Sequence, residues 1–175
     1  MAYFYYDYSD SRTHSALELF GSLVGQLLHY VGLNKDVEQW ISQIFQDGSR
    51  MPDNLEVLDL LVRIIRLLPL VHIVIDGLDE CLVGDRSIIL AGIQALAASS
   101  LTTVKVFVAS RMDMDIHAVF KSHSQLKIDK NNIAQDIVHF TRGVVKNKIQ
   151  PKLGFVSDGF ATEIIDAISS KAQGM

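Results

Sequence analysis

Three acidic residues follow directly after a short apolar segment of the sequence. Val71–Ile75 reads Val-His-Ile-Val-Ile, and the next positions bring Asp76, Gly77, Asp79 and Glu80. Carboxylate oxygens suit Mg²⁺, which takes one or two carboxylates together with water and substrate phosphates. We therefore predict that Asp76 binds Mg²⁺, and that Asp79 or Glu80 orients or deprotonates an attacking water. A solvated acidic turn that only caps the next helix is the alternative.

A second apolar segment ends in a hydroxyl group and a guanidinium group. Val104–Ala109 reads Val-Lys-Val-Phe-Val-Ala and is followed by Ser110 and Arg111. The planar fork of an arginine matches phosphate geometry, although an arginine after a strand more often forms a surface ion pair. Because this segment comes one helix-length connection after the acidic one, we predict that Ser110 and Arg111 contact a nucleotide and that Arg111 reaches its terminal phosphate.

Both segments are predicted to be strands, since they are short, apolar and rich in β-branched residues. A third strand is predicted over Tyr3–Tyr8 and a short one over Gln125–Ile128. A capping box at Ser15 and Glu18 marks the start of the first helix. Asn34 can cap the second helix, and Asp85 can cap the helix that ends at about Ala98. The apolar periodicity predicts helices over Thr13–Val31, Asn34–Phe45, Pro52–Leu68, Asp85–Ala98, Ile133–Lys148 and Asp158–Ala172.

Strands that alternate with helices predict an α/β fold with a mostly parallel sheet. A helix that joins two strands of one sheet nearly always forms a right-handed crossover between parallel strands. The carboxyl ends of Val71–Ile75 and Val104–Ala109 should therefore lie at one edge of the sheet and bring Asp76 and Arg111 together. We expect the Tyr3–Tyr8 strand on the other side of Val71–Ile75, with Asp7 or Tyr8 at the same edge.

The composition is that of a globular protein, with 49% hydrophobic and 21% charged residues. The net charge of −4 argues against a nucleic-acid partner. No secretion signal or membrane span is visible, so we expect a cytoplasmic protein without membrane contact. Cys81 is the single cysteine, and the six histidines lack metal-binding spacing, so neither suggests a metal site.

Together, residues 73–81 and 108–111 resemble the NACHT-type NTPases of the STAND signalling class, most closely the nephrocystin-type N-terminal domain of large fungal repeat proteins. The resemblance implies a three-layer P-loop-NTPase-like core and one partial domain over residues 1–175. It makes Asp76 the Walker B metal ligand, Asp79 the neighbouring acidic residue and Arg111 the sensor arginine. The intact parent would bind Mg²⁺ with ATP or GTP, and protein partners through repeat or effector domains.

The chain departs from this family in one large respect, because it contains no Gly-x-x-x-x-Gly-Lys-Ser/Thr phosphate loop. The resemblance places that loop upstream of Met1 and a winged-helix region downstream, so we expect a core incomplete at its N-terminus. Losing about four hydrogen bonds to charged groups costs about 6–12 kcal/mol, against about 8 kcal/mol for a whole micromolar complex. We therefore expect no cofactor on this chain alone and no hydrolysis by it.

Two other functions stay open. One is a degenerate, non-catalytic protein-interaction module, which the absence of an upstream phosphate loop would favour. The other is an unrelated Mg²⁺-dependent phosphohydrolase that uses Asp76, Asp79 and Glu80. We also expect self-association or aggregation, because the family's central first strand is missing and its loss exposes apolar strand edges.

Overall fold

The computed structural model describes residues 1–10, 14–45, 48, 50–98, 103–128, 130–153 and 157–171. Residues 1–122 and 123–175 form two compact units. Each unit is described by itself, and the expectation of a single domain over the whole chain stays a prediction.

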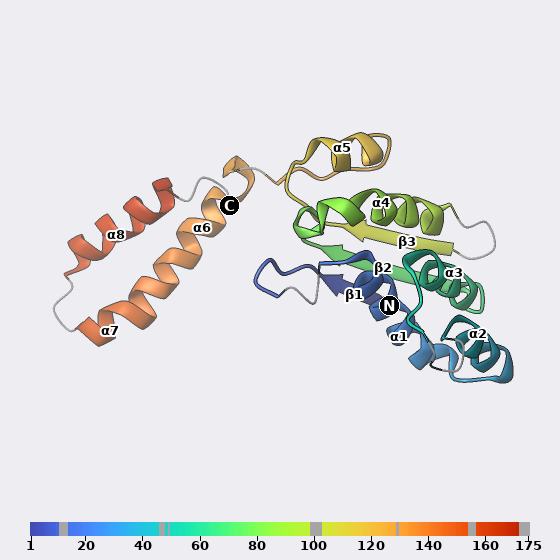
Figure 1. Ribbon diagram of the computed structural model, residues 1–175. Helices are drawn as coiled ribbons and strands as arrows, with labels where there is room; N and C mark the ends of the chain where they lie inside the picture. Colours follow the sequence, from blue (N-terminus) through green and yellow to red (C-terminus); the bar gives the residue numbers. More distant parts are fainter. Residues whose placement is uncertain are drawn as a thin grey trace. The chain divides into compact units, whose positions relative to one another are not determined.

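The first unit is built on an open, three-stranded parallel sheet (Figure 1). Its strands are β1 (Ala2–Tyr5), β2 (Leu70–Asp76) and β3 (Thr103–Val108), in the order β1-β2-β3. The predicted α/β class, the parallel strands and their order are confirmed. The prediction of a strand over Gln125–Ile128 is wrong, since these residues are exposed and irregular.

Five helices and the 3₁₀ turn between β2 and α4 accompany the sheet in the described part of the first unit. The helices are α1 (Ala16–Val31), α2 (Lys35–Phe45), α3 (Asn54–Ile65), α4 (Val83–Ala97) and α5 (Met114–Phe120), and the turn is η3 (Leu78–Glu80). The predicted capping box at Ser15 and Glu18 starts α1. The predicted cap of α2 is also present, since Asn34 Oδ1 accepts the Val37 N–H at 3.0 Å.

The predicted cap at Asp85 is wrong. Helix α4 begins at Val83, so Asp85 lies in its first turn. Its carboxylate instead accepts the backbone N–H of Ala16 at 2.9 Å. Because Ala16 is the first residue of α1, Asp85 satisfies a free donor of a different helix.

The helices that join the strands pack on one face of the sheet. The chain moves from β1 to β2 to β3 in one direction across the sheet, and right-handed crossovers then place the connecting helices on the same face. Alternate side chains of the strands are buried beneath them: Ala2, Phe4, Val71, Ile73 and Ile75. The other face is bare in the described part of this unit, where Tyr3, Tyr5 and Phe107 are 48%, 54% and 61% exposed. In the described residues of this unit, the three-layer core that the resemblance implies is therefore incomplete.

The regular elements described in the second unit are all helical. It consists of α6 (Lys130–Val144), a π-helical turn η4 (Val145–Ile149), α7 (Gln150–Leu153) and α8 (Asp158–Lys171). The two predicted helices are present with shifted ends, and Ala172 lies outside the described residues. A small cluster of Val145, Ala161 and Ile165 forms the buried core. No helix in the described ranges is long and apolar enough to cross a membrane.

Candidate functional site

Strands β2 and β3 end side by side at one edge of the sheet. The N–H of Ala109 donates to the carbonyl of Ile75 at 2.8 Å, and the N–H of Leu78 donates to the carbonyl of Ala109 at 3.1 Å. Asp76 is the last residue of β2, and Arg111 follows β3 at the same end. The predicted arrangement of the acidic segment and Arg111 at one edge is therefore confirmed.

Asp79 holds the segment that carries Arg111. Its Oδ1 accepts the backbone N–H of Arg111 at 2.8 Å, and its Oδ2 lies 3.8 Å from Arg111 Nε. The Asp79 side chain is 14% exposed, whereas the Arg111 side chain is 84% exposed. An ion pair with such an exposed partner contributes little to stability. The Arg111 guanidinium is therefore available to a ligand, while the Asp79 carboxylate holds the Arg111 backbone N–H.

Glu80 links the acidic turn to the segment after β1. Its Oε2 accepts the N–H of Tyr8 at 2.7 Å, and its Oε1 lies 4.0 Å from Arg111 Nη2. The backbone of the same segment also bonds His14, whose Nε2 lies 2.7 Å from the Asp7 carbonyl oxygen. Asp7 and Tyr8 thus lie at the predicted edge.

The Asp7 carboxylate is occupied within its own turn. Its Oδ1 accepts both the hydroxyl and the N–H of Ser9, at 2.6 and 2.9 Å. The hydroxyl bond first, and the N–H bond second, lower the pKa of Asp7 below its ordinary value. Asp7 is therefore ionised at neutral pH and adds negative charge near the site.

Asp76 is an exposed residue whose carbonyl oxygen accepts the N–H of Tyr6 at 2.9 Å. In the part of the chain that the structure describes, no group of three or more His, Cys, Asp or Glu residues is arranged to hold a metal ion. The donor set fits Mg²⁺ bound mainly by water and phosphate with one protein carboxylate, and does not fit an ion held by protein alone.

Arg86 is a residue of the site that the sequence analysis missed. It is 9% exposed, and its Nη2 donates to the carbonyl of Asp79 at 2.8 Å. Its Nη1 donates to Asp113 Oδ2 at 2.7 Å and lies 3.4 Å from the Asp115 carboxylate. A single guanidinium therefore ties the acidic turn after β2 to the segment after β3.

The sequence carries a signal for this burial. Arg86 falls at helical spacing with Ile89, Leu90 and Ile93, all of which are buried. A cation that shares a face with apolar residues must either reach solvent or find carboxylate partners. That pattern indicates a buried ion pair, although it does not name the partners.

Burial also governs two groups beneath the site. Cys81 is 4% exposed, and burial raises the pKa of its thiol despite a hydrogen bond with Arg86. Burial likewise raises the pKa of the Tyr6 hydroxyl, which makes no hydrogen bond among the described residues. Cys81 is therefore a small buried side chain whose raised pKa disfavours the thiolate.

Gly77 sets the turn between Asp76 and η3. Its φ is 70°, and a Cβ atom added to it would lie 3.0 Å from the carbonyl oxygen of Tyr6. Gly77→Ala is expected to lower the free energy of unfolding by about 1–3 kcal/mol, because alanine is strained at positive φ and meets this backbone atom. Urea denaturation measures the change.

Gly84→Ala is the matched control, since a Cβ atom there has no neighbour within 4 Å and the residue lies in α4. Alanine should leave stability unchanged or raise it by up to about 1 kcal/mol. Equal losses from the two substitutions would show that Gly77 is not required by the turn.

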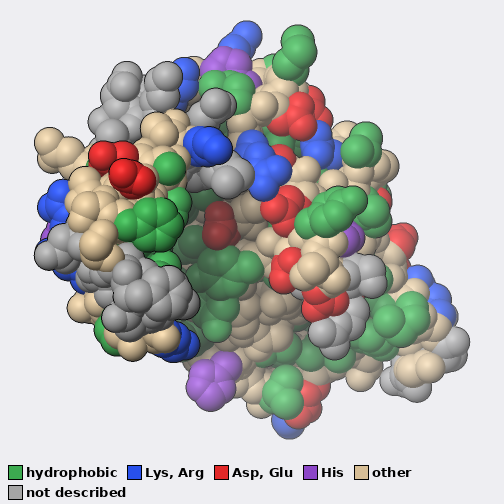
Figure 2. Space-filling model, turned by 90° about the vertical axis from the view of Figure 1, so that its left-hand side faces the viewer, with side chains coloured by type: hydrophobic (Ala, Val, Ile, Leu, Met, Phe, Trp, Pro, Cys, Tyr) green, Lys and Arg blue, Asp and Glu red, His purple; other side chains and the backbone are tan. Residues whose placement is uncertain are grey.

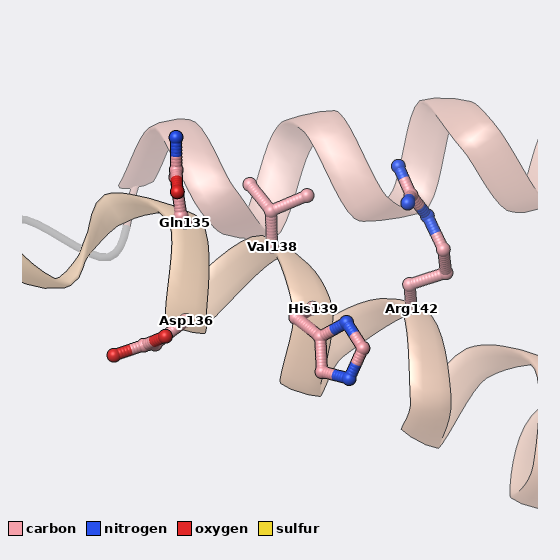
Figure 3. A pocket seen from close by; sticks show the side chains of 5 residues that line it. All are labelled: Gln135, Asp136, Val138, His139 and Arg142. Atoms are coloured by element: carbon pink, nitrogen blue, oxygen red, sulfur yellow. The ribbon is translucent and has the colours of Figure 1, made fainter.

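Two open hollows of the described surface lie away from these residues. On the face shown in Figure 2, basic side chains are interspersed with acidic and apolar ones. An open hollow of about 480 Å³ lies on α6 of the second unit. Figure 3 shows its lining residues: Gln135, Asp136, Val138, His139 and Arg142. No residue predicted for the nucleotide site lines it.

Comparison with known proteins gives one match. The family model described as nephrocystin 3, N-terminal, matches residues 1–111, which include all three strands and extend to Arg111. No curated protein and no solved structure gives a significant match. The matched region covers more than half of the chain. The chain therefore belongs to the nephrocystin 3 N-terminal family.

Proposed function

We propose that the chain supplies the Mg²⁺-binding and phosphate-sensing side of a NACHT-type, nucleotide-dependent signalling switch and is inactive alone. The observation that carries the proposal is the hydrogen bond between Asp79 and the Arg111 N–H at the common end of β2 and β3. It holds a cationic side chain beside an acidic turn, where open α/β sheets bind their ligands.

Each residue of this edge has a role in the proposal. Asp76 binds Mg²⁺, which offsets phosphate charge when bound. Ser110 contacts the nucleotide, and Arg111 reaches its terminal phosphate. Glu80 is a better candidate than Asp79 for the residue that orients or deprotonates the attacking water. Its side chain is more exposed, 24% against 14%, and within the described residues its Oε1 contacts Arg111 Nη2, at 4.0 Å. Asp79 instead positions the Arg111 backbone.

A switch follows from the connections of Glu80 and Arg111. Glu80 bonds the backbone of Tyr8, so a ligand that draws Arg111 away would change the charge beside the segment after β1. Nucleotide state would then be transmitted through an ordered segment, as in other phosphate-controlled switches. Repeat or effector domains of the full protein would read that state.

The chain's own glycines do not replace the missing phosphate loop. Gly21 and Gly25 lie within α1, and the residue after Gly25 is Gln26 rather than lysine. Backbone N–H groups inside a helix are bonded to carbonyl groups and cannot cradle a phosphate. This supports the proposal that the chain alone does not bind nucleotide.

A non-catalytic interaction module is the second candidate. The bare face of the sheet favours it, because Tyr3, Tyr5 and Phe107 expose aromatic side chains there. In that case the acidic turn and Arg111 serve only to hold the sheet edge together.

Paramagnetic Mn²⁺, a stand-in for Mg²⁺, distinguishes the two candidates. Millimolar Mn²⁺ is expected to broaden the NMR amide signals of Gly77 and Arg111, and Asp76→Asn is expected to remove most of that broadening. Asp36→Asn is the control, because Asp36 is an exposed carboxylate on α2. Equal broadening in both variants would contradict the metal role of Asp76 and favour the interaction module.

A further inference from the structure

Two methionines are among the most exposed large apolar side chains in the described part of the first unit. Met112 and Met114 are 72% and 89% exposed, and they flank Asp113 at the start of α5. A thioether sulfur is a soft, polarisable donor on a flexible side chain, and it selects soft metal ions. The backbone around the pair decides whether both sulfurs can reach one ion.

Asp113 directs the two methionines to one side of the chain. Its backbone is extended, with a φ of −123° and a ψ of 142°, so the side chains of Met112 and Met114 point one way and its own points the other. The Asp113 carboxylate accepts a hydrogen bond from Arg86 Nη1 at 2.7 Å. Because Arg86 is buried, this bond leaves the two methionines on the solvent side.

His117 supplies a third donor on that side. It lies three residues after Met114 in α5, and side chains at this spacing are neighbours on a helix, with Cβ atoms about 5–6 Å apart. The His117 side chain is exposed, and within the described ranges its ring makes no hydrogen bond or ion pair. A ring nitrogen is therefore available to an ion that the two sulfurs also reach.

The segment that carries these donors is held to the rest of the first unit. Ile116 is 6% exposed and belongs to the main hydrophobic core. Arg86 Nη1, which bonds Asp113, also lies 3.4 Å from the Asp115 carboxylate. Contacts behind a metal site orient its ligands and raise its affinity. The backbone between Met112 and His117 is therefore set before an ion binds.

We propose that Met112, Met114 and His117 form a surface site for Cu(I). Two thioethers and an imidazole are a soft donor set, which favours this ion over Mg²⁺ with its oxygen ligands. Histidine spacing alone does not reveal the site, because two of its three donors are methionines. The carboxylates of the sheet edge take no part in it, so the inference does not depend on the proposed nucleotide function.

Silver(I) is the probe, because it shares the charge and softness of Cu(I) and is not oxidised by air. The titration is followed by NMR of methionine methyl groups in a chloride-free buffer. The methyl signals of Met112 and Met114 and the ring signals of His117 should shift together, with a dissociation constant below about 10 µM. Met51 is the internal control, since it is 74% exposed and should not shift. Unshifted signals at about 1 mM silver, or equal shifts of Met51, would overturn the proposal.

Variants separate this site from other groups of the chain. Met114→Leu and His117→Gln should each weaken binding at least about tenfold, whereas Met51→Leu should not. Cys81→Ala should leave the methyl shifts unchanged, because the Cys81 thiol is 4% exposed and is not a ligand of the site. Asp76→Asn should also leave them unchanged. Full affinity in Met114→Leu or His117→Gln, or loss of the shifts in either of the last two variants, would overturn the proposal.

Oxidation supplies a second readout that needs no variant. Hydrogen peroxide converts exposed methionines to sulfoxides, and bound silver occupies the sulfur lone pair that reacts. Met112 and Met114 should therefore oxidise at least about threefold more slowly with silver than without it, while Met51 oxidises at the same rate. Mass spectrometry of peptides measures the three rates. Oxidation of Met112 and Met114 that silver does not slow would contradict the site.

Discussion

Replacement of Arg86 by methionine is expected to lower the free energy of unfolding by about 3 kcal/mol. The substitution keeps the apolar stem and removes the bonds to the Asp79 carbonyl and to Asp113. The side chains of Asp113 and Asp115 are 40% and 50% exposed, so water can partly replace the lost guanidinium. The expected loss of unfolding free energy therefore lies at the lower end of the range of about 3–5 kcal/mol for removing one partner of a buried ion pair.

Urea denaturation followed by the fluorescence of Trp40, the single tryptophan, measures this loss in the first unit. The Arg111 amide should also exchange faster in the variant, because Arg86 holds the turn that carries its acceptor, Asp79. Arg63→Met is the control. Arg63 is 43% exposed in its pair with Asp59 and lies 5.8 Å from the ring centroid of Trp40, so the fluorescence baselines are measured separately for this variant. Its loss should cost about 1 kcal/mol. Equal losses would contradict the role given to Arg86.

Phe20→Ala is expected to cost about 3–5 kcal/mol of the free energy of unfolding, because Phe20 is the largest fully buried side chain among the described residues. Phe20 is fully buried in α1, and its ring lies against Gly92 of α4. A Cβ atom added at Gly92 would come within 2.6 Å of Phe20 Cζ. The absence of a side chain at Gly92 therefore lets the ring fill the space between the helices.

A double-mutant cycle tests this contact. Gly92→Ala alone should destabilise by about 1–3 kcal/mol through overpacking, and Phe20→Leu alone by a similar amount through a cavity. The double variant should lose less than the sum, because the smaller side chain makes room for the added methyl group. Additive losses in thermal or urea unfolding would show that Phe20 and Gly92 are not coupled.

The strands that carry the site, and the start of α1, could be predicted from the sequence because strong local signals encode them. Val71–Ile75 and Val104–Ala109 are short and β-branched, and the handedness of crossovers then decides which strand ends meet. Ser15 with Glu18 marked the start of α1 by a local hydrogen-bond pattern. None of these predictions required knowledge of a distant contact.

Features that depend on distant residues could not be predicted in the same way. Asp85 caps α1 rather than α4, across 69 residues of sequence, and Glu80 bonds Tyr8 across 72. Helix α5 was missed because seven residues with Ile116 alone buried give no periodic signal. The exposed face of β3 was also hidden, since an apolar strand looks the same whether one face or both are covered.

Isothermal titration calorimetry of the chain with ATP or GTP and Mg²⁺ tests the central claim most directly. The structure has an acidic turn and an exposed Arg111 at one sheet edge, but the sequence has no Gly-x-x-x-x-Gly-Lys-Ser/Thr loop to hold the phosphates. A P-loop ATPase measured in the same buffer serves as the positive control. We predict no saturable heat at sub-millimolar nucleotide, and a micromolar dissociation constant for either nucleotide would contradict the account.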